Sequence, residues 1–493
     1  MSPDTRWRRN LQLSTTSYVV ALLTIAAAIL RVIFLNSKSL WLDEGISAMR
    51  SAMPLGALTR ELVYNDTNMA LYQLIQYWWS HLAGSSEISL RFPSVIFATV
   101  TIPLIYALGA ELVDRRVGLI AALLLCVNVS NIQYAQEARS YSMVGMLVTL
   151  SSLFFVRSIQ RSSYQRLRDY LIVGPWAAYA QLFGILILPA QWLSLFLFRA
   201  DRTARFRLTV CIAVVASLSL PAVILAMLGD HGQVGWIPTT TGTEVIRTFA
   251  MFAGVYWGSL SVVPNWLLFA TYLAIIAIAG SRASEDERPA VGFLLLSVVT
   301  PVVIALLVSI FKPLFVYRYL LICQPFFVLV AAVGLTRIKP RSVTVAITIL
   351  IVALSLSEDR TFYRSGSKQD WRGAINFVGA NAKPGDVLLV FPEWNKSPVD
   401  YYVGRLNGAA DFRVITDRLH SLDGTGGASN HQADNLRSFL TAHSIDSYTR
   451  VWIVTDVAHR NEPAMRELEI GHQVTAGPHL AGLVLARIDQ VKN

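Results

Sequence analysis

The chain has 493 residues, of which 54% are hydrophobic and 15% are charged. A soluble protein carries about 25% charged residues, so this composition excludes an ordinary soluble protein and indicates a polytopic α-helical membrane protein. The formal net charge is +10. It does not indicate nucleic-acid binding, because the arginines lie in short segments between apolar runs, as the orientation of membrane proteins requires.

Apolar runs predict the transmembrane helices, since a span needs about 20 apolar residues. Nine runs are candidates: 16–35, 92–111, 117–134, 141–157, 208–229, 264–280, 290–311, 319–336 and 342–357. The first run has the length of a span and a poor cleavage site. We therefore expect an uncleaved first helix rather than a signal peptide.

Arginine-rich segments predict the topology. They lie at 6–9, 115–116, 157–168, 199–207, 282–288 and 337–341, and we assign all six to the cytoplasm. The N-terminus is then cytoplasmic, and the apolar region 170–198 must cross twice or re-enter. We predict about 11 transmembrane helices, or 13 if the aromatic segment 249–263 and one more segment form a hairpin. We expect five parts of the chain on the outer face: the loops 36–90 and 230–248, the turns 135–140 and 312–318, and everything after residue 358.

A change of composition after residue 358 divides the chain into a membrane domain, 1–358, and a C-terminal domain, 359–493. Residues 370–392 and 435–457 each predict a helix followed by a buried strand, and 481–489 predict a closing strand. Alternating helices and strands are typical of a small α/β domain with a largely parallel sheet. The segment 423–432 is expected to be a loop.

Ionisable residues are almost absent from the predicted spans, which counts against an ion-coupled transporter. Arg31 lies near the outer end of the first span, and we expect its side chain to reach the membrane surface. The cysteines, Cys126, Cys211 and Cys323, lie in predicted spans without metal-binding spacing. They are interpreted as packing residues.

Polar residues gather instead where spans emerge on the outer side. Four clusters stand out: Asp43-Glu44 in "KSLWLDEG", Tyr64, Asp66 and Asn68 in 64–79, "QYAQEARSY" at 133–141, and Lys312, Arg318 and Tyr319 in 312–320. Adjacent helical residues point about 100° apart, so Asp43 and Glu44 cannot address one atom as equals. One could act as a base while the other holds a partner or a metal.

The spacing of the third cluster, 133–141, would bring its polar side chains together in pairs if the segment is a helix. Gln136 and Arg139 would then share one face, and Glu137 and Tyr141 another. Arginine binds phosphate bidentately, and a carboxylate can take a proton from a hydroxyl group. A lipid-linked phosphate in the outer leaflet would suit these groups.

A purely structural interpretation of the same residues stays open. Arg139 and Arg318 could anchor helix ends to lipid headgroups, which is the commoner role of interfacial arginines. Asp43 and Glu44 could cap a helix and interact with its dipole. The concentration of all four clusters on one side of the membrane favours a functional site.

These motifs resemble those of the GT-C glycosyltransferases, specifically the branch of protein O-mannosyltransferases and the lipid A aminoarabinose transferase, glycosyltransferase family 39-like. The similar stretches are "SLWLDEG", residues 84–109 with Glu87, Arg91 and Pro93, "QEARSY", "YRYLLICQP" at 317–325 and "DWRGA" at 370–374. The resemblance is strongest over residues 30–160, patchy to 375 and weak beyond.

The resemblance implies an inverting transferase. It would move a hexose or pentose from polyprenyl phosphate to a lipid, glycan or protein hydroxyl at the outer face of a bacterial cytoplasmic membrane. By the same resemblance, Asp43 would deprotonate the acceptor, Glu44 would orient it or bind a metal, and Arg139 and Arg318 would hold the phosphate. The donor site would further include Glu137, Tyr141 and Tyr319.

Asp66 would be a second carboxylate. Asp43, Glu44 and Asp66 could also supply oxygen ligands to Mg²⁺ or Mn²⁺, although no spacing requires a metal. Many relatives have His or Lys and then two prolines after the acidic residue. Here Asn68 stands at the basic position and Met69-Ala70 replace the prolines. A neutral amide cannot neutralise a phosphate, so the arginines would carry more of that contact.

Three other functions remain as alternatives. A glycan polymerase or ligase is disfavoured because His81, His231 and the histidines of the tail lie outside the motifs. A non-enzymatic transporter of lipid-linked sugars would need a polar path through the bilayer. A scaffold would use its C-terminal domain to bind an acceptor or an assembly partner.

Overall fold

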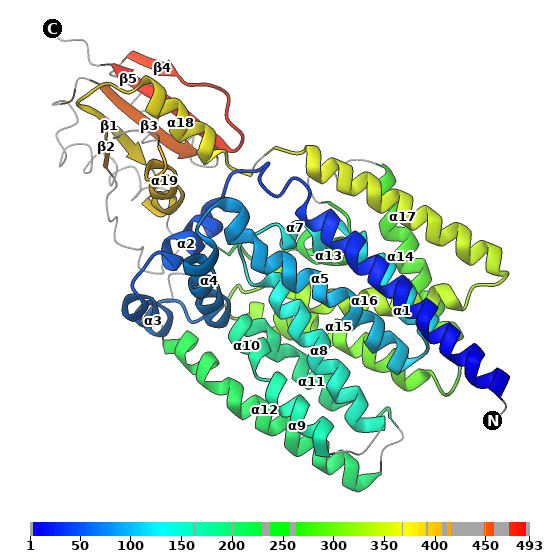
Figure 1. The fold of residues 1–493 in the computed structure, drawn as a ribbon. Coiled ribbons are helices and arrows are strands. Elements are labelled where there is room, and N and C mark those ends of the chain that lie inside the picture. Colours follow the sequence, from blue (N-terminus) through cyan, green and yellow to red (C-terminus); the bar gives the residue numbers. More distant parts are fainter. Residues whose placement is uncertain are drawn as a thin grey trace. The chain divides into compact units, whose positions relative to one another are not determined.

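The structure is a computed structural model (Figure 1). It describes residues 3–160, 164–198, 201–228, 237–256, 263–366, 368–390, 393–406, 412–415, 448, 450–457 and 473–489. The chain forms two compact units. One unit comprises Met1–Ile33, Leu55–Ile75 and Arg91–Arg364, and the other comprises Phe34–Pro54, Gln76–Leu90 and Ser365–Asn493. The loop expected at 36–90 is therefore shared between them.

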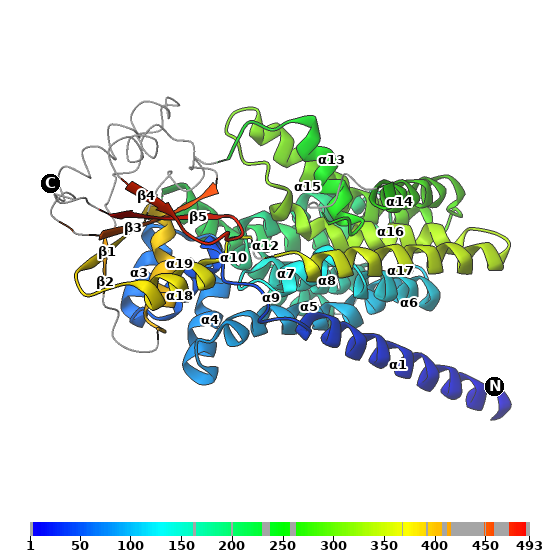
Figure 2. The same cartoon turned by 90° about the horizontal axis from the view of Figure 1, so that it is seen from above.

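Long apolar helices lie side by side in the first unit (Figures 1 and 2). In the part of the chain that the structure describes, eight helices are long and apolar enough to cross a membrane. They are the apolar part of α1 (Pro3–Val32), α5 (Glu87–Leu112), α8 (Tyr141–Gln160), α12 (Arg202–Leu228), α14 (Val263–Arg282), α15 (Arg288–Ser309), the 3-10 helix η4 (Tyr317–Cys323) continued by α16 (Gln324–Thr336), and α17 (Arg341–Arg364).

A ninth span results if α6 (Arg115–Cys126) and α7 (Val129–Ala135), which meet at a 60° bend, count as one broken helix. The predicted class, a polytopic helical membrane protein with a small C-terminal sheet domain, is confirmed. The expected number of about 11 spans is not reached among the described residues.

Much of the difference lies in region 170–198, which is broken into short pieces: α9 (Tyr164–Val173), α10 (Trp176–Ala180), the 3-10 helix η1 (Leu182–Leu186) and α11 (Ile187–Ser194). The first break follows Gly174-Pro175, where proline removes a backbone donor. The second lies at Gln181, whose backbone is extended. None of these pieces reaches the length of a span. Segment 249–263 contains the end of α13 (Gly242–Phe252), and its residues 257–262 lie outside the described part.

Helix α16 forms the centre of the first unit. Nearly all of its residues are buried, and it packs against α6, α14 and α15. Gly334 permits this packing, because a Cβ atom there would lie 2.1 Å from the Ile275 carbonyl oxygen on α14. Small residues allow such close helix approach in membranes. Helix α1, in contrast, exposes Tyr18, Leu22, Ile25 and Ile29, as a lipid-facing helix does.

The expectation for Arg31 was wrong, since its side chain is fully buried. The bend between α6 and α7 explains its position. The end of a helix leaves carbonyl groups without intrahelical partners, and Arg31 donates to two of them, Leu125 O at 3.1 Å and Cys126 O at 3.2 Å. It also donates to Asn131 Oδ1 at 2.6 Å. A cation at a helix C-terminus is further favoured by the helix dipole.

The second unit contains a five-stranded sheet with strand order β2-β1-β3-β5-β4. The strands are β1 (Asp386–Val390), β2 (Phe412–Ile415), β3 (Arg450–Asp456), β4 (Gln473–Ala476) and β5 (Leu483–Asp489). Strand β1 pairs in parallel with β2 and β3, whereas β5 pairs antiparallel with β3 and β4. The sheet is therefore mixed rather than largely parallel. A short connection between β4 and β5 allows only antiparallel pairing.

Helices α18 (Trp371–Asn381) and α19 (Lys396–Val403) lie on one side of this sheet (Figure 2). The predicted helix and strand in 370–392 are thus confirmed. The loop expected at 423–432 and the helix expected after 435 lie outside the described residues. The unit also includes α2 (Leu42–Ser51) and the end of α4 (Ala70–Ala83). Helix α3 (Leu55–Tyr64) belongs to the first unit.

Candidate active site

The acidic pair lies in the first turn of α2, where the helix dipole favours negative charge. Glu44 is 1% exposed, and its Oε2 accepts a hydrogen bond from the Trp41 N–H at 3.4 Å. It therefore helps to cap the helix, as the structural alternative expected. Asp43 is only half-buried. The two carboxylates consequently have different environments, and Asp43 is the more exposed of the two.

Backbone groups on both sides of Trp41 are held by residues of the C-terminal domain. The Leu40 N–H donates to Tyr402 Oη at 2.8 Å, and the Leu42 N–H donates to Gln369 Oε1 at 3.3 Å. The Lys368 ammonium lies 4.0 Å from the centroid of the Trp41 ring, a cation–π distance. No local pattern in the sequence indicates that the C-terminal domain supports this loop.

The "QEARSY" segment is not a helix. Residues 136–140 form a turn between α7 and α8, as the predicted topology requires, so the helical face that Gln136 and Arg139 would share on a helix does not exist. Gln136 Nε2 donates instead to Arg31 O at 3.1 Å and Ile33 O at 2.8 Å. It thereby fixes the turn against the end of α1. Glu137, Arg139 and Tyr141 are each at most 7% exposed.

Three of the predicted donor-site residues come together around Tyr134. The Tyr134 hydroxyl interacts electrostatically with Glu137, Tyr141 and Arg318, and the Tyr134 and Tyr141 ring centroids are 5.0 Å apart. The turn and η4 converge because η4 packs against α8. Arg139 belongs to the same turn as Glu137, and the Arg318 guanidinium lies 5.6 Å from the centroid of the Tyr319 ring. We call Glu137, Arg139, Tyr141, Arg318 and Tyr319 the arginine cluster.

The segment with Asp66 connects to the same region of the first unit. Asn68 Oδ1 accepts a hydrogen bond from the Leu182 N–H at 3.2 Å, and the neighbouring Phe183 ring lies 5.2 Å from the Tyr319 ring. On the other side, Tyr72 and Ser94 share a hydrogen bond of 2.9 Å, and Ser94 Oγ donates to Arg139 O at 3.0 Å. Asn68 thus contributes a hydrogen bond that holds this segment against the start of η1.

Met69 also changes the backbone at this point. Its φ is 69°, in the left-handed region that non-glycine residues rarely adopt. Proline cannot take this conformation, because its ring fixes φ near −65°. A proline at position 69 would therefore be incompatible with this path of the chain before α4.

Two residues of this region escaped the sequence analysis. Arg247 on α13 lies 3.8 Å from the Tyr317 ring centroid and pairs with Glu244 at 3.6 Å. Gln181, at the break before η1, is 1% exposed, and neither polar atom of its amide has a hydrogen-bond partner among the described residues. For Arg247 the only signal in the sequence was its place as an arginine in the expected outer loop 230–248. For Gln181 the sequence offered none.

The predicted site residues are divided between the two units. Asp43 and Glu44 belong to the second unit, and Asp66 and the arginine cluster belong to the first. The described residues contain no group of three or more His, Cys, Asp or Glu side chains placed to hold a metal. The role of Mg²⁺ or Mn²⁺ stays a prediction.

Comparison with known proteins identifies the fold. Residues 70–228 match the family model described as dolichyl-phosphate-mannose-protein mannosyltransferase. No curated protein matches the sequence. Among solved structures, ArnT from Cupriavidus metallidurans in the apo state is similar with a TM-score of 0.62 at 13% identity, over 96% of this chain and 98% of that chain.

Two ligand-bound structures are also similar. ArnT bound to undecaprenyl phosphate matches with a TM-score of 0.56 at 13% identity, over 95% of this chain and 97% of that chain. The archaeal oligosaccharyltransferase AglB from Archaeoglobus fulgidus, in complex with an inhibitory peptide and a dolichol-phosphate, matches with a TM-score of 0.57 at 12% identity, over 91% and 70% of the two chains. The chain has the GT-C glycosyltransferase fold, and the predicted resemblance is confirmed.

Proposed function

We propose, from this GT-C fold, that the protein is an inverting glycosyltransferase with a polyprenyl-phosphate-linked sugar as donor. The acceptor is a hydroxyl group of a lipid, glycan or protein at the outer face of a bacterial cytoplasmic membrane. The N-terminus is cytoplasmic and the C-terminal domain is extracytoplasmic. The match of residues 70–228 to a mannosyltransferase family and the polyprenyl phosphates of ArnT and AglB support the donor class.

Asp43 is the general base of this proposal. Its carboxylate takes the proton of the acceptor hydroxyl as that oxygen attacks the anomeric carbon. The bond between this carbon and the phosphate oxygen breaks, and polyprenyl phosphate leaves with the bonding electron pair. Attack opposite to the leaving group inverts the anomeric configuration. The partial exposure of Asp43 beside a buried, helix-capping Glu44 is the observation that carries this assignment.

Arg139 and Arg318 hold the phosphate and stabilise the charge that grows on it as the sugar departs. Their support is the convergence of two distant motifs, since the turn at 136–140 and η4 meet at Tyr134. In this proposal Glu137, Tyr141 and Tyr319 complete the donor site around the phosphate. Asp66 is kept as a second carboxylate, which binds a sugar hydroxyl or a divalent cation.

Cells that lack the protein test the proposal. Mass spectrometry of their envelope lipids and glycans should show one sugar missing from one acceptor and its polyprenyl-phosphate form accumulating. A plasmid copy of the wild-type chain should restore both. An unchanged set of glycans and glycolipids would contradict a transferase role.

Gln181 gives a prediction that separates activity from stability. A buried amide without partners costs about 1–3 kcal/mol, so Gln181→Met should raise the melting temperature of the purified protein. In the proposed site this amide hydrogen-bonds the sugar of the donor, so the same substitution should lower the transfer rate by about 2- to 12-fold, because one hydrogen bond contributes about 0.5–1.5 kcal/mol. Thermal unfolding and initial rates of one preparation check both. A variant that is less stable and fully active would contradict this role.

A further inference from the structure

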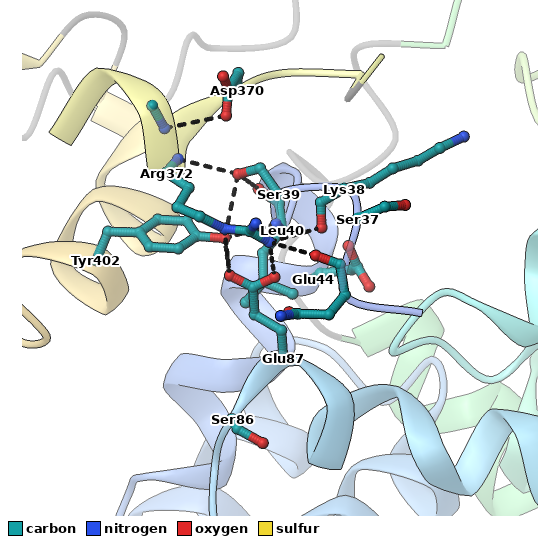
Figure 3. A network of polar contacts seen from close by, with 12 residues as sticks. Ser37, Lys38, Ser39, Leu40, Glu44, Ser86, Glu87, Asp370, Arg372 and Tyr402 are labelled. Carbon is teal, nitrogen blue, oxygen red and sulfur yellow. Dashed lines mark hydrogen bonds and ion pairs between the residues drawn. The ribbon is translucent and has the colours of Figure 1, made fainter. Parts of the chain in front are cut away.

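Three motifs that lie far apart in the sequence meet within the second unit (Figure 3). Glu87, the first residue of α5, receives two hydrogen bonds from the Arg372 guanidinium of "DWRGA", one of them from Nε at 3.0 Å. The Tyr402 hydroxyl of α19 donates to Glu87 Oε1 at 2.8 Å. The Arg372 N–H donates to Ser39 Oγ of "SLWLDEG" at 3.1 Å. We call Glu87, Arg372 and Tyr402 the clamp.

The clamp is built from strong interactions. Glu87 is 8% exposed, and a bidentate arginine–carboxylate pair combines charge with fixed geometry. Burial lowers the pKa of Arg372, but the hydrogen bonds and the charge of Glu87 outweigh it and raise the pKa overall. Burial of the Tyr402 hydroxyl, followed by repulsion from Glu87, raises its pKa above the usual value. The tyrosine therefore stays protonated and keeps donating.

The clamp reaches the backbone that leads to Asp43. Arg372 Nη2 donates to Asn36 O at 3.1 Å and Lys38 O at 3.2 Å, and Tyr402 Oη accepts the Leu40 N–H at 2.8 Å. Helix α2 begins two residues after Leu40. The backbone groups of Asn36, Lys38 and Leu40 are thus each hydrogen-bonded to a side chain of the C-terminal domain.

Helix α2 itself is also held in place, because it packs against α19. A Cβ atom at Gly45 would lie 2.6 Å from Pro398 N and 2.7 Å from Pro398 Cδ, a distance that real side chains do not reach. The glycine of "LDEG" therefore lets α19 approach the helix directly after Glu44. Asp43 sits between two anchored points, and both anchors belong to the C-terminal domain.

We infer that the C-terminal domain is a positioning part of the active site, and that Arg372, Glu87 and Tyr402 are positioning residues that set the place of Asp43. This inference rests on the proposed role of Asp43 as the base. Displacing a reacting group by about 1 Å costs about 100-fold in rate. Releasing the clamp should therefore lower the rate at saturating substrate, whereas loss of a recruitment surface would weaken acceptor binding.

The test compares Arg372→Gln with the matched control Arg450→Gln in the full-length protein in lipid nanodiscs. Arg450 also makes a bidentate pair, with Asp386, but its contacts lie within the sheet domain. Hydrogen exchange of peptides covering 38–45 reports on the loop without any ligand. Polyprenyl-phosphate lipids and acceptors extracted from the host membranes serve as substrates for initial rates.

Arg372→Gln should speed exchange in peptides 38–45 and lower the saturated rate by about 10- to 100-fold, and Arg450→Gln should do neither. Glu87→Gln combined with Arg372→Gln should cost little more than either change alone, because the two residues act as one unit. Arg372→Lys keeps the positive charge but cannot bind the carboxylate bidentately, so its rate should lie between those of the wild type and Arg372→Gln.

Unchanged exchange in 38–45 with a full rate for Arg372→Gln would overturn the clamp, and so would a rate loss that appears only as weaker acceptor binding. These outcomes are distinct from a failure of the proposed function. If the wild-type protein transfers no sugar, or if Asp43→Asn is fully active, the base assignment fails whatever the clamp variants do.

Discussion

Replacing Asp43 with asparagine is expected to abolish sugar transfer and to leave the fold intact. The amide keeps the shape of the side chain and cannot take a proton. General base catalysis contributes about 10²- to 10⁴-fold to a rate, so activity should fall by at least about 100-fold. Initial rates of purified protein, with thermal unfolding as the check on the fold, measure the effect.

The neighbouring Glu44→Gln change is the matched control, because it removes the same charge one residue away. Glu44 is buried and accepts the Trp41 N–H, and the glutamine oxygen can accept that hydrogen bond too. Most of the activity should therefore remain, with a small loss of stability. Equal losses for both variants would mean that the two carboxylates act as a pair and would contradict the division of roles.

Replacing Arg31 with methionine is expected to be the most destabilising single change in the first unit. Carbonyl oxygens of Leu125 and Cys126 would lose their donor, and the buried Asp359 would lose the cation with which it interacts electrostatically. Leaving a buried acceptor without its donor costs about 1–3 kcal/mol, and Arg31→Met does this to both carbonyl groups. Thermal unfolding in detergent, with ligand-free protein, measures the loss.

Arg157→Met is the control for this prediction. Arg157 pairs with Glu111 at 3.2 Å, but its side chain is 30% exposed, and a solvent-exposed ion pair contributes about 0–1 kcal/mol. Combining Arg31→Met with Asp359→Leu should recover part of the stability, because the double variant also removes the buried Asp359 carboxyl group, whose oxygens have no hydrogen-bond partner among the described residues. A melting temperature for Arg31→Met close to that of Arg157→Met would contradict the buried contacts.

Local patterns in the sequence predicted much of the fold. Apolar length predicted the long helices, and "DWRGA" with the following strand predicted α18 and β1. Asp370 starts α18 by accepting the Gly373 N–H at 3.0 Å, a cap that is readable from sequence. Each of these features depends on neighbours within a few residues.

Features that depend on distant partners could not be predicted. Arg31 is buried because α6 ends beside it, and α6 ends there because the helix bends at Cys126–Val129. The topology predicted a turn at 135–140, but the sequence could not show that Gln136 binds carbonyl groups at the end of α1 and holds the turn there. The sequence alone does not show why residue 45 is a glycine. The reason is its close contact with Pro398 of α19, which leaves no room for a side chain.

The candidate site divides in the same way. Asp43 and Arg318 stood out by residue type at the ends of apolar runs. Gln181 has no such signal, since its interest comes only from burial without a partner. The contribution of "DWRGA" to the loop of Asp43 required the pairing of Arg372 with Glu87, which connects residues that no local pattern relates.

We propose that this protein cleaves a polyprenyl-phosphate-linked sugar and that Asp43 directs the transfer. The most direct measurement supplies extracted polyprenyl-phosphate sugars and host acceptors to nanodisc-embedded protein, and follows free polyprenyl phosphate and glycosylated product together. The wild-type chain should form both in equal amounts with inverted anomeric configuration, and Asp43→Asn should form neither. Translocation of intact donor without cleavage, or equal product from both proteins, would contradict the claim.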